Sequence, residues 1–142
     1  MAKLFPLLGL LRVRTVQQEQ AAVVAATAVR HANSVRVRRQ AVVDELGRSA
    51  DTPANPEVMM AIAAARSSSR GMLAELESLI ALADADAAAA KASLAEARSK
   101  TIPLEKMELR HRNDAFAEDL RIEQNTLDEI ATNSWHRARA AV

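Results

Sequence analysis

The sequence contains no cysteine, only 2% aromatic residues, three glycines and four prolines. Without cysteine, the chain has no disulfide framework, no thiolate metal site and no cysteine nucleophile. A globular core for 142 residues normally uses more large aromatic and β-branched side chains than this composition offers. The composition therefore argues against a compact globular enzyme.

No strong charge of either sign is present. Charged residues make up 26% of the chain and the formal net charge is +1, so the bulk charge does not indicate nucleic acid. A basic cluster of Arg30, Arg36, Arg38 and Arg39 has no aromatic residue among it on which bases would stack. We expect these arginines to form a solvated flank or a docking face for a protein, and we expect no nucleic-acid ligand.

Long hydrophobic runs are absent as well. The apolar run Leu4–Leu11 is closed by Arg12 and Arg14, and Ala21–Val29 is equally short, so neither is long enough to span a bilayer. The first run also lacks a convincing cleavage site for a secretory signal. We therefore expect no membrane-spanning segment.

What the chain does contain is a stripe of small and apolar residues at alternating spacings of three and four. A mean spacing of 3.5 residues predicts helices that supercoil about each other with a left-handed twist. The fold class expected is therefore all-α, an antiparallel coiled-coil hairpin of two helices. We call these positions the seam: Leu7, Leu11, Ala21, Ala25, Ala28, Ala32, Val35, Val42 and Leu46 in the first segment, and Met59, Ile62, Leu73, Leu76, Ile80, Ala83, Ala87, Ala90, Leu94 and Ala97 in the second.

The chain is expected to form one coiled-coil domain of residues 1–142. Its first helix covers about 6–47 and its second, longer helix about 57–138. A dense cluster of turn-forming residues, SADTPANP, predicts the connecting loop at about 48–56.

Individual residues predict where the helices end. Gly47 suits a left-handed cap at the end of the first helix. Asn55, Pro56 and Glu57 read as the N-cap, the first-turn proline and a favourable acid at the start of the second. Pro103 removes one backbone hydrogen bond, so we expect a kink there, with a clean break as the alternative.

The register of the hairpin follows from pairing large seam residues with small ones. Pairs whose position numbers sum to 108 satisfy this rule, for example Val35 with Leu73 and Ala28 with Ile80. This register centres the turn on Ala54, and a slip of three or four residues is the alternative. It also leaves everything after about Pro103, roughly 40 residues, beyond the end of the first helix.

The overhanging segment carries an apolar stripe in a different phase from the seam. We call it the tail stripe, and it consists of Leu109, Phe116, Leu120, Leu127 and Ile130. An isolated amphipathic helix is only marginally stable in water. The tail stripe is therefore expected to bind a partner, whether another part of this chain, a second copy or another protein.

Two segments of the overhang resemble the C-terminal pattern of the flagellar FliJ family. They are LEKMELRHR at 104–112 and EQNTLDEIA at 123–131, and the opening FPLLGLLRVR at 5–14 resembles the family's hydrophobic-then-basic start. The sequence departs from the family at Met107, Leu109 and Asn125, where the usual residues are Leu, Glu and Lys.

The resemblance implies a non-enzymatic component of the flagellar type III export apparatus. Its implied partners are the hexameric export ATPase, the membrane export-gate protein and export chaperones, with no cofactor and no small-molecule substrate. The implied location is cytoplasmic, at the inner face of the inner membrane. The candidate partner-binding residues are Glu105, Arg110, Arg112, Phe116, Leu120, Glu123, Gln124, Leu127, Asp128 and Glu129.

Two other functions stay open at this stage. The chain could be a stalk or scaffold subunit of another secretion or rotary-ATPase-like assembly, or a helical bundle that associates with itself. Catalysis has little support, because no phosphate loop, zinc-protease motif or serine elbow is present. Asp84 and Asp86 lie two positions apart, on different sides of a helix. His31, His111 and His136 lack the spacing of a metal site.

Overall fold

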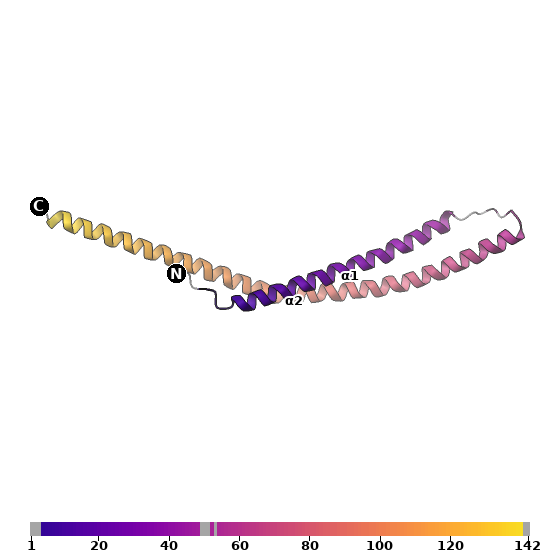
Figure 1. Ribbon diagram of the computed structural model, residues 1–142, viewed down its shortest axis with the longest axis horizontal. Helices are drawn as coiled ribbons and strands as arrows, with labels where there is room; N and C mark the ends of the chain where they lie inside the picture. Colours follow the sequence, from indigo (N-terminus) through magenta and orange to yellow (C-terminus); the bar gives the residue numbers. More distant parts are fainter. Residues whose placement is uncertain (1–3, 49–51, 53, 141–142) are drawn as a thin grey trace. The chain divides into compact units, whose positions relative to one another are not determined.

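The computed structural model describes residues 4–48, 52 and 54–140, without the side chains of Ala138 and Ala140. Within these ranges it contains two helices, α1 (Leu8–Arg48) and α2 (Pro56–Ala140), and no strand (Figure 1). The helix–helix contacts are those of a hairpin, so the predicted all-α fold with a longer second helix is confirmed. No helix within the described ranges is long and apolar enough to cross a membrane.

The start of α2 is as predicted. The side-chain oxygen Oδ1 of Asn55 accepts a hydrogen bond from the backbone N–H of Val58 at 2.8 Å. The carbonyl oxygen of Asn55 accepts the N–H of Met59 at 3.1 Å. Pro56 is the first helical residue and Glu57 the acid of the first turn. Asn55 is therefore the N-cap, and it satisfies an amide that the helix cannot pair internally.

The end of α1 differs from the prediction. Gly47 is not a left-handed cap, because no residue in the described ranges has a positive φ and α1 continues to Arg48. Arg48 forms an ion pair with Glu45 at 2.9 Å, which favours a helical last turn. Of the predicted loop, residues 49–51 and 53 lie outside the described ranges.

Pro103 does not break α2. The helix is continuous from Pro56 to Ala140 with Pro103 inside it, so the alternative of a clean break is excluded. Two residues earlier, Thr101 is almost completely buried, and this packing holds the helix in place next to the proline. A kink at Pro103 stays a prediction.

Packing divides the chain into two compact units, which we describe separately. The hairpin unit is Gln17–Arg98, and the terminal unit combines Met1–Val16 with Ser99–Val142. The assignment of the whole chain to a single domain stays a prediction.

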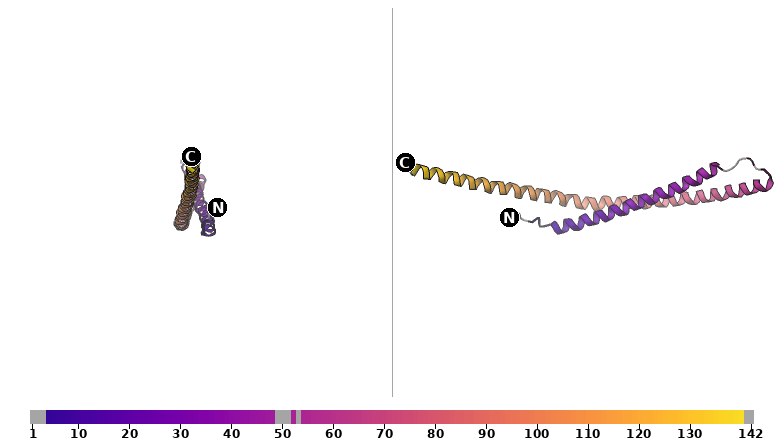
Figure 2. Two further views of the ribbon diagram at one scale, coloured as in Figure 1. Left: turned by 90° about the vertical axis from the view of Figure 1, so that its left-hand side faces the viewer. Right: turned by 45° about the horizontal axis from the view of Figure 1, so that its top comes forward.

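In the hairpin unit, the violet part of α1 lies alongside the pink part of α2, and the views of Figures 1 and 2 agree on this. The buried residues all belong to the predicted seam: Ala25, Ala32, Val35, Leu76, Ala83 and Ala87. Most are alanines, so the two backbones can approach closely along the seam. The seam prediction is thus confirmed within this unit, with one exception described below.

Two ion pairs connect the helices beside the seam of the hairpin unit. Arg36 bonds to Asp84, and Arg39 bonds to Glu77 at 3.1 Å. All four side chains are at least one-third exposed, so each pair contributes no more than about 1 kcal/mol. Their greater value is that they fix which residues of the two helices lie opposite each other.

The contacts between the helices do not fit the predicted register. Position numbers sum to 116 for Arg39 with Glu77 and to 120 for Arg36 with Asp84. In the terminal unit Arg14 and Thr101 sum to 115, where 108 was expected, so the helices are displaced from the prediction by at least one heptad. A slip of seven residues again brings most seam positions opposite seam positions, for example Val35 opposite Ile80, so the apolar pattern alone does not distinguish the two registers. One consequence is that Met59, predicted in the seam, is exposed.

The terminal unit has a small core of its own. Leu11 and Thr101 are buried, and the hydroxyl Oγ1 of Thr101 donates a hydrogen bond to the carbonyl oxygen of Arg14 at 3.4 Å. The ring of Phe5 lies 5.7 Å from the ring of His111, centroid to centroid. Phe5, which precedes α1, thus contacts α2 at His111.

The slip also shortens the overhang. Ala115 is the last half-buried residue of α2, and every side chain described from Phe116 onward is exposed. The segment without a partner therefore begins near Phe116 and not near Pro103. We call residues 116–140 the tail.

Candidate partner-binding site

Residues of the tail support a helix locally, although no other segment within the described ranges packs on it. Arg121 forms two hydrogen bonds with Glu118 one turn earlier, at 2.8 and 2.9 Å. The hydroxyls of Thr126 and Thr132 bond to carbonyl oxygens four residues earlier. Such pairs stabilise an isolated helix by only a few tenths of a kcal/mol each. Tertiary contact would stabilise the tail much more.

The tail stripe lies on one face of the helix, because its spacings are multiples of three and four. Phe116 is 66% exposed, Leu127 65% and Ile130 59%. Leu109 and Leu120 are about half exposed. A surface helix of a folded domain normally buries such a face, so the stripe has the character of an interface.

The predicted site residues do not all lie on this face. Glu123 lies on it, at the stripe position between Leu120 and Leu127, and Gln124 is at its edge. Arg110 and Arg112 are on its two sides, near Leu109. Glu105, one turn earlier, is exposed at the same edge as Arg112.

Asp128 and Glu129 are exposed but point elsewhere. At 100° per residue, each lies about 130° from the centre of the tail stripe. A partner that covers the stripe would therefore leave these two carboxylates in solvent. They resemble the family motif in sequence, but the helix does not bring them onto the apolar face.

Two arginines, one shortly before the tail and one within it, already form ion pairs with carboxylates of α2. Arg112 contacts Glu108 at 3.5 Å and Arg121 contacts Glu118 at 2.8 Å. The hydrogen bonds that Arg121 donates to Glu118, together with the negative charge of that carboxylate, raise the pKa of the exposed Arg121 guanidinium, so Arg121 stays charged. The carboxylate of Glu123, by contrast, has no hydrogen bond or ion pair within the described ranges.

One exposed apolar residue of the tail was not singled out from the sequence. Ile122 is 52% exposed and lies seven residues after the half-buried Ala115, on the face of α2 that packs against α1 earlier in the helix. Extending the spacing of the buried positions along the sequence would therefore have identified it. At the end of the tail, the guanidinium of Arg139 lies 4.8 Å from the centre of the Trp135 ring. The His136 ring meets Trp135 edge-on at 5.2 Å.

The arginine cluster of α1 is mostly engaged inside the hairpin unit. Arg36 and Arg39 form the ion pairs with α2, and Arg30 bonds to the hydroxyl of Thr27 at 3.1 Å. These contacts give the cluster a structural role in register. They do not test whether it also docks a protein.

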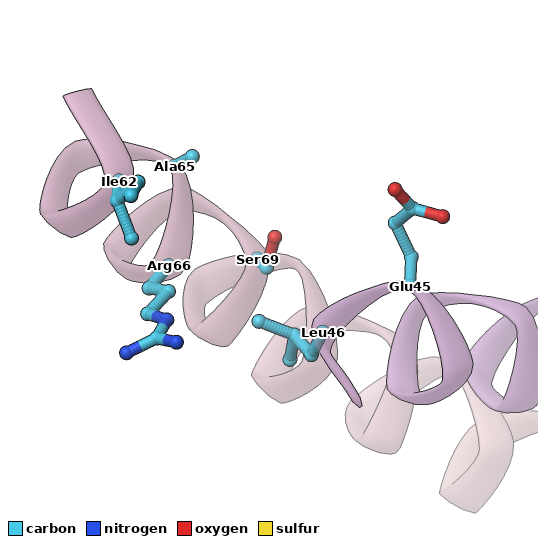
Figure 3. A pocket seen from close by; sticks show the side chains of 6 residues that line it. All are labelled: Glu45, Leu46, Ile62, Ala65, Arg66 and Ser69. Carbon is cyan, nitrogen blue, oxygen red and sulfur yellow. The ribbon is translucent and has the colours of Figure 1, made fainter. Parts of the chain in front are cut away.

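The hairpin unit also has a hollow where α1 ends. It measures about 140 Å³ and is lined by Glu45, Leu46, Ile62, Ala65, Arg66 and Ser69, as Figure 3 shows. Pockets for drug-sized ligands measure about 300–1,000 Å³. The hollow is therefore too small for such a ligand. Within the described ranges, no group of His, Cys, Asp and Glu side chains could hold a metal ion.

Comparison with known proteins agrees with the resemblance in the overhang. The family model described as "Flagellar FliJ protein" matches residues 3–140, which is nearly the whole chain. No curated protein and no solved structure matches. The match covers both helices and the tail, including all the candidate partner-binding residues. The chain therefore belongs to the flagellar FliJ family and is a protein of flagellar export.

Proposed function

We propose that this chain is a non-enzymatic component that couples the export ATPase ring to the membrane export gate and assists export chaperones. The observation that carries the proposal is the tail, a helix with an exposed apolar stripe and no partner in the described part of the chain. Membership of the family supports a role in flagellar export. The tail stripe supplies the surface that binds the ATPase.

The mechanism is one of differential contact. A helix inserted among the subunits of a ring changes their conformations only if it binds one subunit state more tightly than another. The tail stripe offers contact to subunits along one face, whereas the carboxylates of Asp128 and Glu129 face away from it. Subunits around the helix therefore meet different surfaces, which allows their states to differ.

The test is binding of the purified full-length chain to the purified export ATPase, measured by calorimetry. Replacing Phe116, Leu120 and Leu127 by alanine is expected to weaken binding at least about tenfold, because a few apolar anchors dominate most interfaces. The matched control replaces Val23, Met60 and Leu82, three exposed apolar residues of the hairpin unit. This control is expected to bind as the unchanged chain does.

Equal binding by the tail variant and the unchanged chain would exclude the tail stripe as the ATPase contact. The gate contact needs a separate experiment with the cytoplasmic part of the gate protein. If the hairpin unit binds the gate protein, the control variant with its hairpin residues replaced should lose this binding. The tail variant should keep it.

A further inference from the structure

The tail stripe is interrupted at its centre by one charge. Continuing its spacing of three and four residues gives eight positions: Leu109, Asn113, Phe116, Leu120, Glu123, Leu127, Ile130 and Ser134. Glu123 is the single charged residue among them, with a leucine on each side. Its carboxylate is exposed and has no ion pair or hydrogen bond within the described ranges.

The nearest cations do not reach Glu123 because they are committed elsewhere. Arg121 bonds to Glu118, on the side of the helix away from the stripe, through both Nε and Nη2. Arg112 bonds to Glu108, three turns before Glu123. Whatever covers the stripe therefore meets an uncompensated negative charge between two apolar turns.

A second copy of the chain does not meet this requirement. If two tails pair in parallel, Glu123 lies opposite Glu123 of the other copy, and like charges are brought together in the interface. If they pair antiparallel, Glu123 lies opposite Leu120 or Leu127 and loses its water without gaining a partner. Antiparallel registers that place Glu123 opposite Asn113 or Ser134 also give its carboxylate no cation, and the first of them puts Ile130 opposite Lys106.

A straight partner helix fits the stripe well. From Phe116 to Ile130 the stripe runs about 21 Å along the axis in steps of three and four residues, the spacing of a helix that packs on another helix. A cation at the matching central position would pair with Glu123. Burying an unpaired carboxylate is costly, whereas a paired one is tolerated, so that cation decides which helices bind.

We propose that the tail stripe binds a protein helix that places a lysine or arginine opposite Glu123 between two apolar turns, and that Glu123 prevents the stripe from pairing with a second copy. This inference rests on the proposed function, since it specifies the partner surface of the same tail. It identifies Glu123 as the residue that selects the partner.

The test uses the full-length chain as its own probe. The Glu123→Lys variant carries the same apolar stripe with a lysine at the centre. Sedimentation equilibrium is measured for the unchanged chain, for Glu123→Lys and for their equimolar mixture. Each protein alone is expected to be monomeric, and the mixture is expected to form a 1:1 dimer at least about tenfold more tightly than either alone. High salt should weaken the dimer only partly, because the pair is partly buried.

Two further variants sharpen the result. In Glu123→Leu the stripe is continuous and apolar, so this protein alone is expected to self-associate. Glu129→Lys makes the same charge change about 130° from the stripe centre, and its mixture with the unchanged chain is expected to stay monomeric. Self-association of the unchanged chain, a monomeric Glu123→Lys mixture, or equal pairing by Glu129→Lys would each overturn the inference.

The outcome can be separated from that of the proposed function. Suppose that the triple-alanine tail variant binds the ATPase as the unchanged chain does, while Glu123→Lys pairs with the unchanged chain. The ATPase proposal then fails, and the assignment of the partner helix stands. If the ATPase binds through the tail but the Glu123→Lys mixture is monomeric, the proposed function stands and the role of Glu123 fails.

Discussion

The hydroxyl of Thr101 donates a hydrogen bond across 3.4 Å to the carbonyl oxygen of Arg14, joining two helical segments that are 87 positions apart in sequence. Thr101 is the most deeply buried side chain described, with 1% exposed. It lies where the N-terminal part of α1 covers α2, next to Pro103. A polar residue on the face of α2 that packs against α1 is compatible with burial here because its hydroxyl has a partner.

Replacing Thr101 tests how much this contact contributes. Thr101→Val keeps the β-branched shape and removes the hydroxyl, so the free energy of unfolding is expected to fall by less than about 1 kcal/mol. Thr101→Asp buries a charge without a partner and is expected to lower it by more than about 3 kcal/mol. Urea unfolding followed by helical circular dichroism measures both. Equal losses in the two variants would show that polarity at this position does not matter.

The register can be tested with cysteines, since the natural chain has none to interfere. A register with the position sum of Arg14 and Thr101, which is 115, places Ala32 opposite Ala83, and both are 2% exposed. The double variant Ala32→Cys with Ala83→Cys is expected to form an intramolecular disulfide readily on mild oxidation. The control pairs Ala32→Cys with Leu76→Cys, which the register summing to 108 would place together.

Seven residues correspond to about 10 Å along the helix, beyond the reach of a disulfide. Electrophoresis without reductant separates the cross-linked form from the open one. Cross-linking of the control but not of the Ala83 pair would contradict the register set by Arg39 and Glu77.

How far the sequence predicts this fold is clearest at the seam. Buried positions such as Ala32, Val35 and Ala83 follow from their spacing alone, because only a helical face facing another helix explains small residues every three and four positions. The N-cap Asn55 is predictable for a similarly local reason, since its side chain and the following proline act within one turn.

The register was not predictable in the same way. A shift of one heptad keeps seam residues opposite seam residues, so the deciding contacts are those of flanking side chains such as Arg39 with Glu77. The prediction of a left-handed cap at Gly47 was wrong for another reason, because glycine permits such a cap without requiring one. In the tail, periodicity predicts the exposed stripe, but the turn-by-turn position of Asp128 and Glu129 is evident only once the helix is known to be continuous.

The flanking ion pairs are expected to contribute modestly to stability. Because Arg36, Arg39 and their partners are partly exposed, Asp84→Ala and Glu77→Ala should each lower the free energy of unfolding by no more than about 1 kcal/mol. Raising the salt concentration should reduce the loss, because salt screens exposed charges. A double-mutant cycle of Arg39→Ala with Glu77→Ala isolates the pair. A coupling of several kcal/mol, insensitive to salt, would contradict this.

Gly71 offers a stabilising substitution. It lies inside α2 with a φ that other residues adopt, and an added Cβ would meet no atom within 4 Å. Gly71→Ala is therefore expected to raise the free energy of unfolding by about 0.5–1 kcal/mol, mainly because alanine restricts the unfolded chain more. Gly47→Ala, one residue before the end of α1, serves as the comparison and should gain less. Thermal unfolding of both variants measures the difference.

The tail should be far less protected than the hairpin unit in the free protein. Of the side chains described from Phe116 onward, none is buried, so local pairs such as Arg121 with Glu118 hold the helix, whereas Ala83 and Leu76 lie in a packed seam. Hydrogen exchange followed by mass spectrometry is expected to show amides of residues 118–137 exchanging at least about a hundredfold faster than those around Ala83. Adding a partner that covers the stripe should slow exchange in the tail and leave the seam unchanged. Equal protection of tail and seam in a monomeric sample would mean that the tail packs on part of its own chain, and the stripe would then not be free to bind another protein.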